Sequence, residues 1–288
     1  MFEFLIAPFA DFGFMQRALV GVVAIALGGG PVGVFLMLRR MSLTGDAMAH
    51  AILPGAAVGY LLAGLSLPAM TVGGLVAGVV VAVAAGLVSR FTALKEDASL
   101  AAFYLLSLAL GVTIVSLRGS NVDLLHVLFG TVLALDDNTL LLLASISTLT
   151  VMALAILYRP LVLECVDPIF LRSVSRAGTP THLAFLGLVV LNLVGGFHAL
   201  GTLLAVGMMM LPAAASRFWA SDITAMMIVS ILIGMVSGVG GLLLSFHLEL
   251  PAGPAIILTA GIVYVMSLVF GREGGLLWLM FPGRHLEA

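Results

Sequence analysis

The sequence predicts an all-α membrane protein, a bundle of about nine helices that cross the lipid bilayer. Of the 288 residues, 62% are hydrophobic and only 9% are charged, and the apolar residues form long runs. Soluble domains contain roughly 45–50% apolar and about 25% charged residues. Because an apolar excess of this size has to be covered by lipid, we expect a single membrane-embedded domain over residues 1–288. The net charge of −2 gives no reason to expect a nucleic-acid partner.

The first residues do not resemble a secretory signal, because Glu3 and Pro8 interrupt the basic start and apolar core that a signal needs. Residues 1–17, which are rich in phenylalanine, predict either a segment at the membrane interface or a frayed tail.

A helix needs about 20 mainly apolar residues to cross the hydrocarbon core. Charged residues, prolines and glycines divide the rest of the chain into nine candidates. The candidate spans are 18–38, 47–65, 68–89, 99–117, 139–158, 182–198, 200–218, 223–246 and 252–270. Glycines near residue 200 also allow 182–198 and 200–218 to form one kinked helix, which reduces the count to eight. The shorter run 121–135 predicts a half-helix or a re-entrant segment.

The distribution of basic residues favours nine spans with the amino terminus outside and the carboxyl terminus in the cytoplasm. Cytoplasmic loops of membrane proteins are enriched in Lys and Arg. With nine spans, all basic residues except Arg17 and Arg118 lie on the inner side. The inner residues are Arg39, Arg40, Arg90, Lys95, Arg159, Arg172, Arg176, Arg217, Arg272 and Arg284. With eight spans, three of these ten would move to the outer side.

The longest inner loop, 159–181, contains a pattern that predicts a short helix. Asp167 can cap such a helix, with Pro168 at its first position, and Phe170 would lie on its apolar face. The helix is either an ordinary interfacial helix or a docking helix for a soluble cytoplasmic subunit.

The chain lacks the motifs of several enzyme classes. It has no phosphate-binding G-x-x-x-x-G-K-[ST] loop and no H-E-x-x-H zinc motif. Its single cysteine, Cys165, excludes a disulfide within the chain and a multi-cysteine metal cluster. We therefore expect neither enzymatic activity nor a permanently bound cofactor, and any ATP hydrolysis must come from another chain.

Asp46 and His50 are the most conspicuous polar residues near a span. Being four residues apart, they share one face of a helix and offer an oxygen and a nitrogen ligand to a divalent ion. Pro54 cannot donate to the carbonyl of His50, so that oxygen is expected to face a cavity. Alternatively, Asp46 stabilises the helix start and His50 is its hydrogen-bond partner. Asp46 is also the only clear buried acid in the predicted topology.

Other acids and histidines lie at the predicted outer ends of the spans. They could form an acidic, imidazole-bearing mouth that accepts a cation, or each could be a solvated loop residue. These residues are Asp123, His126, His198, His247 and Glu249. His182, on the inner side, suggests no function.

Four sequence segments, in order, resemble the zinc/manganese/iron permeases of ABC transporters, the ABC-3 family. Residues 45–55, GDAMAHAILPG, resemble the family signature G-D-A-x-x-H-A-x-L-P-G, which is specific. Residues 123–130, 211–215 and 251–254 resemble three further family motifs, so the similarity covers nearly the whole chain.

This resemblance implies a fold like that of type II ABC importers and a location in the bacterial plasma membrane. It also implies a homodimer that binds two ATPase subunits and receives metal from an extracytoplasmic binding protein. Asp46 and His50 would then form a transient metal site, and the ATPase contact would involve Asp167, Pro168, Phe170 and Arg172. Ile169 and Phe170 depart from the family pattern, which leaves open which ATPase is accepted.

The leading hypothesis is a cation pathway with zinc as the preferred substrate and with manganese or iron as alternatives, because an oxygen and an imidazole suit zinc slightly better. The competing hypotheses are a stand-alone channel or proton-coupled carrier, and a related siderophore or vitamin permease.

Overall fold

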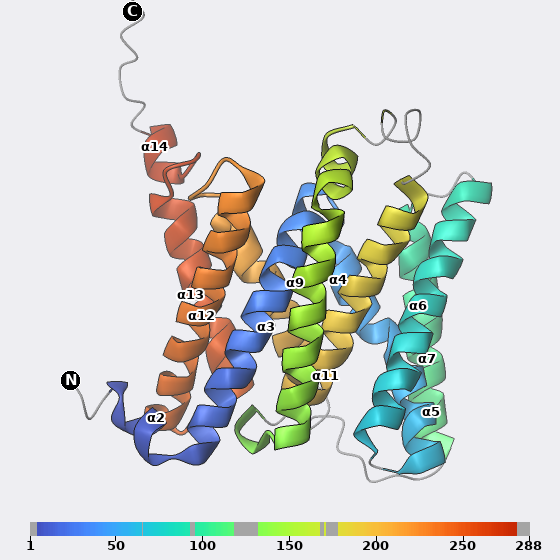
Figure 1. Cartoon of the computed structure of the whole chain (residues 1–288), viewed down its shortest axis with the longest axis horizontal. Helices are drawn as coiled ribbons and strands as arrows, with labels where there is room; N and C mark the ends of the chain where they lie inside the picture. The colour runs from blue at the N-terminus through green and yellow to red at the C-terminus, as the bar shows by residue number, and fades with distance from the viewer. Residues whose placement is uncertain are drawn as a thin grey trace, which may run out of the picture.

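The computed structural model describes residues 5–64, 66–92, 96–117, 132–167, 170 and 178–280. Within these residues there are helices and no strand, and the long helices stand side by side as a bundle (Figure 1). The first and last described helices lie at opposite ends of the bundle. The all-α prediction is therefore confirmed for the described part of the chain.

The described helices overlap all nine predicted spans, although not all of them are long enough to cross a membrane by themselves. Seven helical segments are long and apolar enough to cross a membrane, and Ala98–Ile114 and Gly201–Ser216 are apolar but shorter. The helices are α2 (Ala7–Asp11), α3 (Gly13–Leu38), α4 (Ser42–Ala51), α5 (Leu53–Ala63), α6 (Leu67–Phe91), α7 (Glu96–Leu117), α9 (Asp137–Val166), α11 (Gly178–Ser216), α12 (Ile223–Leu248), α13 (Ala252–Phe270) and α14 (Leu276–Met280), with a short 3-10 turn η1 (Val132–Ala134). Of the predicted segment 121–135, residues 121–131 lie outside the described residues.

The element α11 consists of two helices that fold back on each other at Gly201. The backbone of Gly201 is not helical, with φ 81° and ψ 165°, a conformation that favours glycine. A Cβ atom added at Gly196 would lie 2.6 Å from the Cβ of Ala205, so the two halves pack side by side. The interpretation of this pair as a single kinked helix is therefore wrong.

Several predicted boundaries differ from the observed ones. Helix α3 begins at Gly13 rather than at residue 18, so the predicted interfacial segment 1–17 overlaps the first span. Helix α9 continues to Val166, eight residues into the predicted loop 159–181. It can do so because its only acid in this stretch, Glu164, is neutralised by Arg39 from α3.

Aspartate caps mark where two long helices begin. The side chain of Asp136 accepts from the backbone N–H of Thr139 at 3.1 Å, and Asp222 accepts from that of Ala225 at 3.0 Å. Hydrogen bonds from the Thr139 hydroxyl and backbone hold the pKa of Asp136 below its usual value.

Helix α3 is the most enclosed of the candidate spans and packs tightly against the second half of α11. A Cβ atom added at Gly33 would lie 1.9 Å from the carbonyl oxygen of Met209. Membrane helices approach this closely only where the interface residues are small. Gly33 therefore allows α3 to lie directly against α11.

We expect Gly33→Ala to destabilise the protein by about 1–3 kcal/mol, because the new methyl group would overlap the Met209 carbonyl. Thermal unfolding of the detergent-solubilised protein measures the change. Gly187→Ala in α11 is the control, because a Cβ there has no heavy atom within 4 Å. Without that clash, the higher helix propensity of alanine should leave Gly187→Ala as stable as the wild type or more so. Equal melting temperatures for both variants would contradict the packing argument.

Candidate functional site

The region of residues 42–63 is a helix broken in its middle. Helix α4 ends at Ala51 and α5 begins at Leu53, with Pro54 in its first turn. The buried hydroxyl of Ser107 on α7 donates to the carbonyl of Ala51 at 2.9 Å. The carbonyl of His50 accepts from the backbone N–H of Ile52. The break that Pro54 predicts is thus present, but its freed carbonyls are satisfied by protein groups and the His50 oxygen is not left for a cavity.

Asp46 and His50 lie on one face of α4, as their spacing predicts. Nε2 of His50 is 3.8 Å from Oδ1 of Asp46. This distance exceeds the 2.7–3.2 Å range of a good N–H···O hydrogen bond. Two ligand atoms bound to one tetrahedral ion stand about 3.4 Å apart. The two atoms are therefore too far apart for a good hydrogen bond, and moving them closer by about 0.4 Å would give the spacing of two ligands of one ion.

A cavity of about 140 Å³ lies between α4 and α7, beside Asp46. It can hold several water molecules, each of which occupies about 30 Å³ in the liquid. It is lined by Leu43, Thr44, Asp46, Ala47, Leu100, Ala101 and Tyr104. The carboxylate of Asp46 therefore has space beside it for a hydrated cation.

Tyr104 holds the ring of His50 against α7. The two rings are stacked, with centroids 6.1 Å apart and planes inclined by 29°. Nδ1 of His50 is buried and has no hydrogen-bond partner among the residues that the structure describes. Buried nitrogen atoms are nearly always paired, so an unpaired one suggests water as its missing partner. Nε2, which faces Asp46, is therefore the imidazole atom that an ion beside Asp46 can reach, and the buried Nδ1 is not.

The prediction that Asp46 is the clear buried acid is wrong for the described residues. The Asp46 side chain is 64% exposed on the single chain, whereas that of Glu164 is 7% exposed. Asp46 is exposed because it faces the cavity side of α4, while Gly45 packs against Met209 and Met210.

The structure does not test the predicted outer mouth as a unit. Asp123, His126 and the side chain of His198 lie outside what it describes. His247 and Glu249 are at the end of α12, opposite the α3–α4 turn in the bundle (Figure 1). The described residues contain no group of three or more His, Cys, Asp or Glu able to hold a metal.

Part of the predicted docking helix is visible. The side chain of Asp167 accepts from the backbone N–H of Phe170 at 2.9 Å, as a helix-capping aspartate would. Phe170 is exposed, and Pro168 and Arg172 lie outside the described residues. The docking function stays a prediction.

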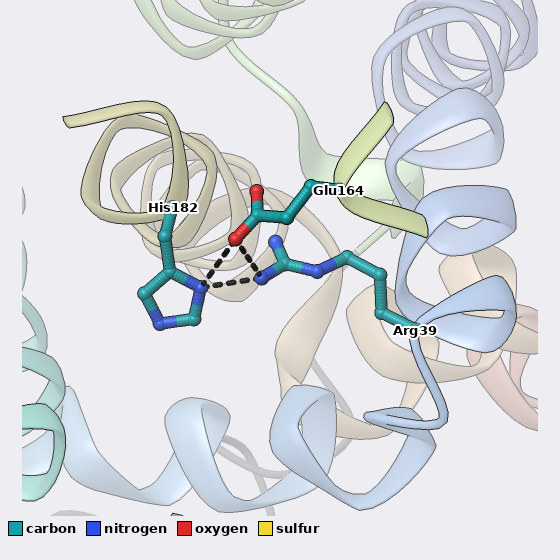
Figure 2. Close-up of polar contacts among 3 residues, drawn as sticks. All are labelled: Arg39, Glu164 and His182. Carbon is teal, nitrogen blue, oxygen red and sulfur yellow. Dashed lines mark hydrogen bonds and ion pairs between the residues drawn. The ribbon is translucent and has the colours of Figure 1, made fainter. Parts of the chain in front are cut away.

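A second polar cluster, which the sequence did not suggest, joins Arg39, Glu164 and His182 (Figure 2). The guanidinium of Arg39 donates to Oε1 of Glu164 at 3.0 Å and to Nδ1 of His182. His182 Nδ1 lies 3.7 Å from the same carboxylate oxygen. The guanidinium also lies 5.1 Å from the ring centroid of Phe185. The cluster connects the end of α3, the end of α9 and the start of α11.

The side chains of this ion pair are deeply buried, with Arg39 8% and Glu164 7% exposed. They are 125 residues apart in the sequence, and Arg39 is 143 residues from His182. No local spacing rule relates residues so far apart. The only available signal was Glu164, an acid in an otherwise apolar stretch of predicted loop.

A model of the ABC 3 transport family matches residues 11–271. The chain belongs to this family. The expected resemblance is therefore confirmed, and the chain is a membrane permease subunit of an ABC importer rather than an enzyme.

Individual relatives agree with this assignment. The chain is 31% identical to the manganese import system permease protein ScaB of Streptococcus parasanguinis, over 89% of this chain and 90% of that protein. It is 28% identical to the chelated iron transport system membrane protein YfeD of Yersinia pestis, over 94% of this chain and 90% of that protein. The structure of PsaBC from Streptococcus pneumoniae in complex with Fab matches with a TM-score of 0.85 and 28% identity, covering 97% of this chain and 100% of that one.

We expect Glu164→Ala to destabilise this permease by about 3–5 kcal/mol, because it leaves the Arg39 guanidinium buried without a counter-charge. The double variant Arg39→Leu/Glu164→Leu should be far closer to the wild type, since it removes both charges and keeps apolar volume. Thermal unfolding in detergent compares the two. A double variant less stable than Glu164→Ala would contradict the pairing.

Proposed function

We propose that this permease moves a divalent transition metal into the cell, that the metal is manganese, and that Asp46 and His50 bind it in passing. The observation that carries the proposal is the 3.8 Å spacing of these two ligand atoms beside a cavity with room for water. The names of the relatives support a metal, since ScaB is named for manganese import and YfeD for chelated iron transport.

The preference for zinc that the ligand types suggested receives no support from these relatives. Oxygen ligands suit manganese, whereas zinc prefers nitrogen and sulfur. The cavity adds space for water oxygens to the Asp46 carboxylate, which brings the site closer to the ligand set that manganese prefers. Sequence spacing showed only the two side chains and not this space.

Weak binding is what a transport step requires. Two side-chain ligands hold an ion less firmly than the closed four-ligand sites that bind structural zinc. Asp46 is exposed on the single chain, so a second copy of the permease can approach this face and complete the pathway. We propose a homodimer that binds cytoplasmic ATPase subunits and accepts the metal from an extracytoplasmic binding protein.

We propose that the end of the bundle bearing Arg39 faces the cytoplasm of a bacterial cell, so that the amino terminus is outside. Arg39 and Arg40 follow α3, and Arg217 and Arg272 flank the α11–α12 and α13–α14 connections at that same end (Figure 1). Cytoplasmic ends of membrane helices are enriched in such residues.

The proposal is tested in proteoliposomes that contain the permease and its ATPase, by measuring the uptake of radioactive manganese supplied with the metal-binding protein. His50→Ala and Asp46→Asn should each lower uptake about 10-fold or more, because the first removes the imidazole ligand and the second removes the negative charge that attracts the ion. Asp137→Asn is the matched control, since this carboxylate is 77% exposed and pairs only with Arg17 among the contacts of the described chain. It should transport like the wild type.

The outcomes separate the competing functions. Unchanged uptake in His50→Ala would refute the metal pathway. Uptake by the purified permease without any ATPase would favour a channel or a proton-coupled carrier. Competition by a tenfold excess of zinc or ferrous iron, measured in the same vesicles, determines which metal the complete system prefers.

A further inference from the structure

We propose that Arg39, Glu164 and His182 form the mechanical link between the ATPase-facing loop and the helix that carries the metal ligands. The inference rests on the proposed function, since it concerns how ATP turnover reaches Asp46 and His50. These three are positioning residues, because they act on the pathway through α4 and touch no substrate.

Glu164 and His182 lie on either side of the loop that is proposed to dock the ATPase, and Arg39 contacts both of them. Glu164 lies in the last turn of α9, three residues before Asp167. His182 lies in the first turns of α11, which begins at Gly178. Figure 2 shows the two side chains converging on one guanidinium. A docked subunit that displaces this loop also displaces the end of α9 and the start of α11. Because Arg39 contacts both of these helix ends, it is displaced with them.

A short, rigid turn joins Arg39 to the metal-binding helix. Arg40 adopts the left-handed conformation with φ 58°, and α4 begins at Ser42. The N–H of Met41 donates to the carbonyl of Leu36 at 2.9 Å, and that of Arg40 to the carbonyl of Met37 at 3.0 Å. These two bonds form a Schellman motif, which closes the end of α3.

Because this turn is short, a movement of Arg39 also moves the start of α4. Asp46 follows the start of α4 by four residues, about one helical turn or 6 Å. A movement of Arg39 therefore shifts the orientation of Asp46 and His50.

Burial makes the link stiff. In a medium of low dielectric constant, opposite charges attract each other more strongly than in water, so separating Arg39 from Glu164 is costly. Nη1 of Arg39 and Oε2 of Glu164 are buried and have no hydrogen-bond partner among the described residues, so each residue has one group that can bond differently in another state.

The same charges argue against a second metal site in this cluster. The guanidinium already neutralises the Glu164 carboxylate and occupies Nδ1 of His182. A divalent cation entering here would meet a fixed positive charge on Arg39. The arrangement therefore favours a link between helices over a ligand set.

The test uses the assembled permease–ATPase complex in proteoliposomes and measures manganese transported per ATP hydrolysed. Arg39→Leu/Glu164→Leu removes the link without leaving a buried charge. We expect ATP hydrolysis to continue while the transport-to-hydrolysis ratio falls at least tenfold. The melting temperature, measured alongside, should stay near that of the wild type, because a merely structural ion pair would change stability and not this ratio.

The chain contains a matched control between the same two helices. Arg17 of α3 and Asp137 of α9 form an ion pair at 3.1 Å at the other end of the bundle, with side chains 51% and 77% exposed. Arg17→Leu/Asp137→Leu should keep the wild-type ratio. A wild-type ratio in Arg39→Leu/Glu164→Leu as well would overturn the link.

Arg39→Lys covers the case in which the double variant does not fold. Lysine keeps the charge but lacks the planar fork that reaches Glu164 and His182 together. We expect a ratio between those of the wild type and the double variant, and a wild-type ratio would again overturn the link. If the wild-type complex itself moves no manganese, the proposed function fails instead, so the two failures are distinguishable.

Discussion

The structure depends on one constraint, which is that every backbone group freed inside a membrane helix must find a partner within the protein. One predicted span is broken at Ile52, between α4 and α5. The hydroxyl of Ser107 on α7 donates a hydrogen bond to the carbonyl of Ala51, which the break leaves without a partner in its own helix. This contact fixes α4 beside α7, where the cavity lies. Without it, the break would be costly, and a continuous helix would direct Asp46 and His50 differently.

The same constraint governs the charged side chains. Glu164 and Arg39 are buried in the bundle as an ion pair, whereas Asp46 lies beside a cavity that water can fill. In this structure one acid is neutralised by an arginine, and the other is left able to bind an ion. This difference explains why we assign the first to transmission and the second to the substrate pathway. Both acids belong to a permease whose energy source is another chain.

Much of this could be predicted from the sequence, because membrane helices are encoded locally. The apolar runs predicted nine segments, and the Asp46–His50 spacing predicted a shared helix face that the structure contains. Boundaries were less predictable, as α9 shows by continuing into a stretch read as loop. Its continuation requires Arg39, a residue that no local pattern connects with Glu164. For the metal, the choice of zinc followed from two ligand types, without knowledge of the space around them.

By itself, the sequence determined the helical class, the approximate spans and the pairing of an acid with a histidine on one helix. These follow from hydropathy and from the 3.6-residue period, which act over a few residues. Only the tertiary structure decided that the chain reverses at Gly201 and that Asp46 faces a cavity. It also decided that Glu164 is buried and meets an arginine 125 residues away. Such outcomes depend on which helices pack together, and packing is a property of the whole bundle.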